Sequence, residues 1–169
     1  YAKNRKHGEV VSFFEGGDRK SVQMFADGRP DGLSTRWFDN GKKSQEETYV
    51  GGIKTGPARS WYESGTKQTE GGFAEGKKDG QWTSYHPNGA KAVEESFAAG
   101  IRTGAYTESH PGGGVAVSGS YAEAAEAGAD DAEAIAPSGE AVGQWKTTRA
   151  DGSVALEADF SAGTARIYG

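Results

Sequence analysis

Glycine recurs every 24 residues along most of this 169-residue chain, and other residues keep step with it. A second glycine follows nine residues after each of these lead glycines, and an aromatic residue follows after seventeen. The lead glycines are Gly8, Gly32, Gly56, Gly80 and Gly104, after which the interval widens to 39 residues before Gly143. Chance does not hold such positions in register over six units, so the sequence predicts a repeat protein.

The repeated glycines and aromatic residues are expected to build the fold rather than a binding site. The chain is poor in aliphatic residues, and large rings bury enough area to stabilise a thin structure. The structural repeat positions that we single out are Gly32, Gly41, Tyr49, Gly56, Trp61, Gly65, Phe73, Gly80, Trp82, Gly89, Phe97, Trp145 and Phe160.

Each unit has the pattern of a β-hairpin. Its centre holds a dipeptide that favours a tight turn, between stretches of strand length that contain Thr, Val and aromatic residues. These dipeptides are Asn40-Gly41, Ser64-Gly65, Asn88-Gly89 and Asp151-Gly152. Pro87 and Pro111 favour a type I turn closed by a glycine bulge, so the register within a hairpin stays open by one residue. The charged, glycine-rich segments between hairpins suit solvated connections.

The repeats predict an all-β fold, in which a repetitive antiparallel β-hairpin array forms a single elongated sheet that grows by two strands per repeat. Repeats occupy residues 1–121, an acidic Ala-rich insertion occupies 122–141, and a final repeat occupies 142–169. Tyr1 falls seven residues before Gly8, where a preceding unit would place its closing aromatic residue. We therefore expect the chain to open inside a repeat.

At two positions in the first strand of each unit, a large side chain at one tends to accompany a small side chain at the other. These positions lie two and five residues after the lead glycine, where Ala58 accompanies Trp61, although Trp82 accompanies the large Tyr85. Because protein interiors are packed to a fixed density, we expect the two positions to fill one shared layer.

The pattern resembles the MORN-variant repeat, a bacterial relative of the MORN repeat. Residues 79–104, DGQWTSYHPNGAKAVEESFAAGIRTG, match nearly all of it. The resemblance spans about residues 1–121 and 142–169, and it implies an elongated hairpin array and, for some members, an antitoxin role. Arg19, Lys43, Lys67 and Lys91 stand where the family pattern has a hydrophobic residue. This departure argues against a second buried face in the first units.

The insertion contains six acidic residues and no basic one. Its 15 extra residues are not required for stacking, so we predict a mobile acidic loop or an element that contacts a partner. The candidate partner-binding residues are Glu123, Glu126, Asp130, Asp131, Glu133 and Glu140. Calcium binding is disfavoured, because the alternating ligand spacing and the glycine of an EF-hand loop are absent.

Two further sets of side chains are candidate sites of chemistry. His86 and His110 occupy equivalent positions, but two strand spacings of roughly 9 to 10 Å separate them and no third ligand repeats there. Glutamates recur fourteen residues after four lead glycines, at Glu46, Glu70, Glu94 and Glu157. Repetition gives them one environment, whereas acid–base catalysis needs two different ones. We expect surface histidines and a solvated charge ladder.

The overall composition limits the classes of function that the chain can have. A net charge of -5 gives no support to nucleic acid as a partner, and no apolar run is long enough to cross a membrane. Nothing in the sequence supports or excludes contact with a membrane surface. We predict no metal, no cofactor and no catalytic residue. We predict a non-enzymatic scaffold or binding module for a protein partner. The alternatives are neutralisation of a toxin and a repeat appendage of an enzyme.

Overall fold

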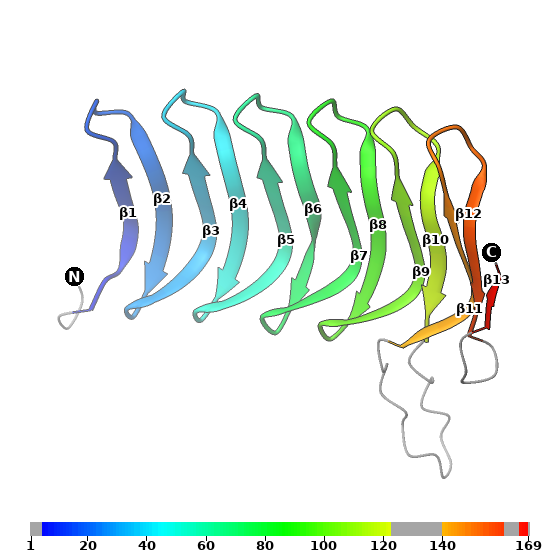
Figure 1. Ribbon diagram of the computed structural model, residues 1–169. Coiled ribbons are helices and arrows are strands. Elements are labelled where there is room, and N and C mark those ends of the chain that lie inside the picture. Colours follow the sequence, from blue (N-terminus) through cyan, green and yellow to red (C-terminus); the bar gives the residue numbers. More distant parts are fainter. Residues whose placement is uncertain (1–4, 123–139, 161–165, 169) are drawn as a thin grey trace, which may run out of the picture. The chain divides into compact units, whose positions relative to one another are not determined.

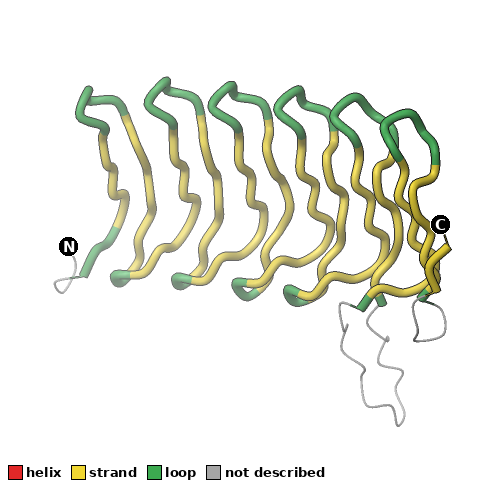
Figure 2. The backbone as a smooth tube through the Cα atoms, viewed as in Figure 1, coloured by secondary structure: helices red, strands yellow, loops and turns green. Residues whose placement is uncertain are grey.

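The computed structural model describes residues 5–122, 140–160 and 166–168, and within these ranges it contains thirteen β-strands and no helix (Figures 1 and 2). The chain divides into two compact units, Tyr1–Lys77 with Pro87–Gly89, and Lys78–His86 with Ala90–Gly169. The strands of the first unit are β1 (Gly8–Phe13), β2 (Arg19–Ala26), β3 (Arg29–Trp37), β4 (Lys43–Val50), β5 (Ile53–Trp61) and β6 (Lys67–Ala74).

The second unit holds the remaining strands, except that the first residue of β7, Lys77, belongs to the first unit. They are β7 (Lys77–Tyr85), β8 (Lys91–Ala98), β9 (Ile101–Ser109), β10 (Val115–Tyr121), β11 (Ala141–Thr148), β12 (Val154–Asp159) and β13 (Arg166–Tyr168). Within each unit, every strand pairs antiparallel with the next one along the chain. The prediction of an all-β fold built from antiparallel hairpins in an open sheet is confirmed.

The hairpin within each repeat closes with a glycine bulge. In the second repeat, Phe38 N donates to Lys42 O at 2.8 Å and Gly41 N donates to Phe38 O at 3.1 Å. Gly41 has a φ of 79°, in the left-handed region that favours glycine. The strand register shifts at the same place in each of the six hairpins, between the fourth and fifth residues after the lead glycine. The register that the sequence left open is therefore the same in every repeat.

A second kind of turn joins one repeat to the next. At Ala99 and Gly100, φ is 49° and 89°, and Ala98 and Ile101 pair directly across this two-residue turn. Two consecutive residues with positive φ are typical of a type I′ hairpin turn. The same feature recurs at Asp27-Gly28, Gly51-Gly52 and Glu75-Gly76. The segments expected to be solvated connections are thus mostly strand, with a turn of two residues between them.

Strand alternation gives the sheet two different faces. Ser34 pairs with Glu47, and Gly32 pairs with Tyr49, so the side chains two and seventeen residues after a lead glycine share one face, which we call the aromatic face. Residues three, five and fourteen after a lead glycine lie on the opposite face, which we call the charged face. The buried hydrophobic side chains among the described residues all lie on the aromatic face; they are Ala58, Trp82 and Phe97, with exposures of 6%, 8% and 9%.

The expected shared layer between the two first-strand positions is wrong. Ala58 and Trp61 are three residues apart in β5, so they point to opposite faces of the sheet. Ala58 pairs with Gly71, whereas Trp61 pairs with Lys67. In two units the large residue two positions after the lead glycine pairs with a small residue across the hairpin, Tyr106 with Gly119 and Trp145 with Ala158.

Candidate interaction surfaces

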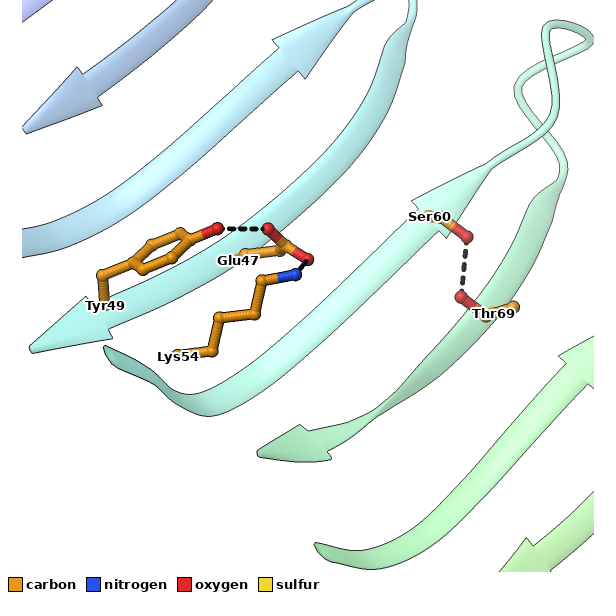
Figure 3. Close-up of polar contacts among 5 residues, drawn as sticks. All are labelled: Glu47, Tyr49, Lys54, Ser60 and Thr69. Carbon is orange, nitrogen blue, oxygen red and sulfur yellow. Dashed lines mark hydrogen bonds and ion pairs between the residues drawn. The ribbon is translucent and has the colours of Figure 1, made fainter. Parts of the chain in front are cut away.

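A buried carboxylate organises the aromatic face of the first unit (Figure 3). Glu47 on β4 is only 7% exposed, and it accepts hydrogen bonds from Tyr49 Oη at 2.7 Å and from Lys54 Nζ at 2.5 Å. Burial opposes ionisation of Glu47, but the bonds from Lys54 and Tyr49 outweigh it and lower its pKa below the ordinary value of 4.5. The charge of Glu47 is therefore matched by its two donors.

Two tyrosines on the aromatic face hold their protons to high pH. Burial and the bond to Glu47 raise the pKa of Tyr49 to about 12, and burial together with the charge of Glu108 raises the pKa of Tyr106 to about 12. Because these values exceed the ordinary 10.0, the folded state favours the protonated phenol. The contribution to stability is complete below pH 10 and is lost as the pH rises to about 12.

This gives a testable pH dependence. We expect the free energy of unfolding of the native chain to fall between about pH 9 and about pH 11.5 by more than that of the double variant Tyr49→Phe, Tyr106→Phe. Urea unfolding followed by circular dichroism at both pH values measures the difference. An equal fall in the two proteins would show that neither phenol is protected by the fold.

Cations cover aromatic rings along the aromatic face. Each cation stands two residues before a lead glycine, and each ring belongs to the closing aromatic residue of the same repeat. The distances from cation to ring centre are 5.2 Å for Lys6 over Phe25, 5.2 Å for Lys54 over Phe73, 4.6 Å for Lys78 over Phe97 and 5.8 Å for Arg102 over Tyr121. These contacts were not predicted from the sequence. The pattern that could have indicated them is a Lys or Arg two residues before the lead glycine in four of six units.

Some of these cations also meet a carboxylate from the neighbouring strand. Arg102 Nε on β9 donates to Glu95 Oε2 on β8 at 2.8 Å, and Lys78 Nζ lies 3.9 Å from Glu95. Glu95 thus has the same role as Glu47: each carboxylate forms an ion pair with a cation on the next strand. Among the described residues of the aromatic face, Glu47 and Glu95 are both paired with cations.

Three aromatic rings join the strands on either side of the insertion. Tyr106 and Trp145 stack with ring centres 5.6 Å apart, and Tyr121 meets their edges at 6.0 Å and 5.2 Å. Trp145 Nε1 donates to Ser120 O at 3.1 Å. Since these residues come from β9, β10 and β11, the repeat continues through the insertion.

Backbone pairing closes the base of the insertion. Tyr121 pairs with Ala141, and Ala122 N donates to Glu140 O at 3.0 Å. Ala122 and Glu140 occupy the positions that Ala98 and Ile101 hold around their two-residue turn. Of the predicted partner-binding residues, only the exposed Glu140 lies in the described part of the chain; Glu123, Glu126, Asp130, Asp131 and Glu133 lie outside it.

Ion pairs run along the charged face, where the glutamate ladder is found. Three of the four glutamates pair with the lysine three residues before them, at 2.5 Å for Lys43–Glu46, 2.8 Å for Lys67–Glu70 and 2.5 Å for Lys91–Glu94. The fourth, Glu157, lies 3.7 Å from Lys146 on the neighbouring strand. Exposed pairs of this kind contribute little to stability, roughly 0 to 1 kcal/mol each. Their repetition keeps this face charged but nearly neutral in sum.

Exposed aliphatic side chains gather on the charged face of the first unit. Leu33 pairs with Thr48, and Val50 pairs with Ile53, so these side chains lie on one face of neighbouring strands. Met24 lies over Gly32, beside Leu33. We call this set the aliphatic patch: Met24, Leu33, Val50 and Ile53, which are 38%, 51%, 61% and 54% exposed. In a chain of mean hydropathy -0.73, such a group marks a candidate contact surface.

The two equivalent histidines connect neighbouring repeats. His86 Nε2 lies 2.8 Å from Ser109 O, and His110 Nε2 lies 2.9 Å from Thr148 O. Both carbonyls stand five residues after the next lead glycine, and both histidines are half-buried rather than on the open surface. The described residues contain no group of three His, Cys, Asp or Glu side chains placed to hold a metal ion.

Comparison with known families agrees with this geometry. Residues 30–50 and 78–99 match the family model described as MORN repeat variant. The chain carries MORN-variant repeats. These matches cover the β3–β4 and β7–β8 hairpins, and the comparison detects no catalytic domain. No curated protein matches the chain. Across the described segments, no helix has the length and apolar character needed to span a membrane.

Proposed function

We propose that this MORN-variant repeat protein is a non-enzymatic interaction module that binds a protein partner through the aliphatic patch. The observation that carries this proposal is the exposure of Leu33, Val50 and Ile53, each more than half accessible on a sheet face. Exposed aliphatic side chains gathered on one face are typical of protein contact surfaces. Carboxylates elsewhere among the described residues, such as Glu46, Glu47 and Glu70, are paired with lysines, which supports a contact role rather than catalysis.

The decisive experiment compares two variants in their binding to a partner. Leu33→Thr, Val50→Thr and Ile53→Thr together keep strand-forming side chains but remove apolar surface. We expect thermal stability to change by less than about 0.5 kcal/mol per site, because exposed positions contribute little. A protein retained from a cell extract by the native chain should be lost from this variant. Lys43→Gln is the matched control on the same face, and it should retain the partner. Equal retention by all three proteins would contradict the proposal.

The insertion is a second element of the same proposal. We propose the organisation into repeats (1–121), insertion (122–141) and final repeat (142–169), with the six insertion carboxylates adding an electrostatic contact to the partner. Such a contact weakens as salt is raised, whereas contact through the aliphatic patch does not. Toxin neutralisation is the special case in which the partner retained through the aliphatic patch is a toxin; growth rescue on co-expression with that partner would identify it.

A further inference from the structure

We propose that two tryptophans on the charged face of the first unit, Trp37 and Trp61, bind a proline-rich protein segment in the polyproline II conformation. We call these two residues the indole row. They are the last residues of β3 and β5, at the tips of two hairpins that stand side by side (Figure 1). Ile53 of the aliphatic patch lies at the other end of β5. The inference therefore goes beyond the proposed function, since it adds a second contact surface and states what binds there.

The strand register places the two indoles in line across the sheet. Gln45 on β4 pairs with Arg36 on one side and with Ser60 on the other. Trp37 and Trp61 directly follow these two residues, so they occupy equivalent places on strands that are separated only by β4. Neighbouring strands lie about 4.7 to 4.9 Å apart, which makes the spacing of the indole row about 9.4 to 9.8 Å.

The indole row also offers two hydrogen-bond donors. Trp37 and Trp61 are half-buried, and among the described residues neither has an acceptor for its indole N–H. Every buried side-chain nitrogen among those residues does have a partner, so both N–H groups reach solvent. Trp145 on the aromatic face differs, because its Nε1 donates to Ser120 O at 3.1 Å. An apolar ring with an open donor is the combination that tryptophan brings to protein interfaces.

The spacing of the indole row fits a polyproline II helix better than other chain conformations. This helix has three residues per turn and rises 3.1 Å per residue, so every third residue falls on the same side at intervals of about 9.3 Å. In a β-strand, side chains on one side recur at about 6.6 to 6.8 Å, which matches neither one nor two strand spacings. In an α-helix, residues seven apart are separated by about 10.5 Å, roughly 1 Å too far. Prolines at every third position would therefore meet both rings.

The backbone of such a segment complements the open donors. A polyproline II helix has no internal hydrogen bonds, so its carbonyl oxygens can accept from the N–H groups of Trp37 and Trp61. The segment is also extended before it binds, which lowers the entropic cost of docking. Aromatic surfaces that bind proline-rich segments use the same two properties.

A cation beside the indole row adds a preference for an acidic residue. Arg59 is exposed on the charged face, two residues before the end of β5. Its cross-strand neighbours Glu46 and Glu70 are held by lysines instead. The distances are 2.5 Å for Lys43–Glu46 and 2.8 Å for Lys67–Glu70. Since no carboxylate among the described residues lies within ion-pair distance of Arg59, an acidic residue that flanks the prolines would supply one.

The test uses the peptide EPQQPQQPE, which has a proline at every third position and an acid at each end, so that it fits in either direction. Its binding to the purified chain is followed through the indole N–H signals of the four tryptophans in NMR spectra. We expect shifts for Trp37 and Trp61 and none for Trp82 and Trp145 on the aromatic face. The peptide EPQPQPQQE has the same composition but prolines at every second position. It should bind about fivefold more weakly, as loss of one anchoring contact does.

Three variants of the chain separate the indoles from the cation. Trp61→Phe keeps a ring but removes the N–H, and it should weaken peptide binding about two- to tenfold, as loss of one hydrogen bond does. Arg59→Gln should weaken binding about two- to fivefold, and it should bind the uncharged peptide QPQQPQQPQ as the native chain does. Arg36→Gln is the matched control, because Arg36 is an exposed arginine next to Trp37 but on the opposite face. It should bind both peptides as the native chain does.

Three outcomes at the indole row would overturn the proposal. Equal binding of the two proline spacings would remove its geometric basis. Equal effects of Arg59→Gln and Arg36→Gln would show that the segment does not lie on the charged face. Hexagalacturonate, an acidic oligosaccharide, represents another polymer with rings that could stack on the indoles, and its binding in place of the peptide would identify a glycan as the occupant.

The result for the proposed function is read separately. The chain with Leu33→Thr, Val50→Thr and Ile53→Thr should bind the peptide as the native chain does, and loss of the peptide from this variant would overturn the indole row as its site. Failure of the native chain to bind the peptide, while the variant still loses the partner from cell extract, would refute this inference and leave the proposed function in place. Peptide binding at the indole row, with the extract partner retained by the variant, would support this inference and refute the proposed function.

Discussion

Replacement of Trp82 with alanine is expected to destabilise the second unit by about 3 to 5 kcal/mol, as loss of a buried large aromatic side chain does. Trp82 is 8% exposed on the aromatic face, and Lys78 Nζ lies 4.3 Å from its ring centre. The variant loses both the buried area and the surface over which Lys78 rests. Urea unfolding followed by circular dichroism measures the effect without relying on tryptophan fluorescence.

Trp61→Ala provides the matched control for this prediction. Trp61 is half-buried on the charged face, opposite Lys67, so its removal should cost about 1 to 2 kcal/mol. If the two positions shared one layer, the two variants would cost the same, and Ala58→Trp would restore stability to the Trp61→Ala chain. Equal destabilisation, or such a restoration, would contradict the assignment of the two faces.

Gly119→Ala is expected to destabilise the strands around the insertion by about 1 to 3 kcal/mol, through overpacking. Gly119 lies opposite Tyr106, and a Cβ atom at this position would overlap the indole of Trp145. The ring cannot move aside without breaking its bond to Ser120 O and its stacking on Tyr106. Urea unfolding of the variant measures the loss.

The cause can be separated from a general intolerance of glycine replacement. Gly112→Ala should be nearly neutral, since no atom lies within 4 Å of a Cβ atom built there. Adding Trp145→Leu to Gly119→Ala should cost less than the sum of the two single changes, because the overlap is relieved. Strict additivity would refute the close packing of Gly119 against Trp145.

Periodicity and turn chemistry made the architecture predictable from sequence. The 24-residue spacing and dipeptides such as Asn40-Gly41 placed the hairpins, since few residues other than glycine adopt the backbone that the bulge needs. The spacing of 39 residues likewise located the insertion before Gly143. These features depend on local backbone geometry, which a short stretch of sequence determines.

The assignment of side chains to faces was not predictable in the same way. Ala58 and Trp61, three residues apart in β5, lie on opposite faces by strand alternation alone, but the face of Lys67 on β6 depends on the register shift opposite Ser60 and Trp61, which the sequence left open. The rings covered by Lys54 and Lys78 lie on neighbouring strands, and their contacts require that register. The aliphatic patch was missed for a related reason. Leu33 follows the lead glycine of one repeat and Ile53 precedes the lead glycine of the next, so the pattern of a single repeat does not bring them together.

The most direct test of the repeat account replaces residues 123–139 with the dipeptide Glu-Gly, taken from the turn at Glu75-Gly76. If the insertion stands where other repeats have a two-residue turn, Ala122 and Glu140 should pair across the new turn as Ala98 and Ile101 do. A shorter loop also closes at lower entropic cost, by about 1 to 2 kcal/mol. We predict an unchanged or higher melting temperature, with the amide spectrum of β9 to β12 preserved. A melting temperature several degrees lower, with loss of the β10–β11 signals, would contradict the account.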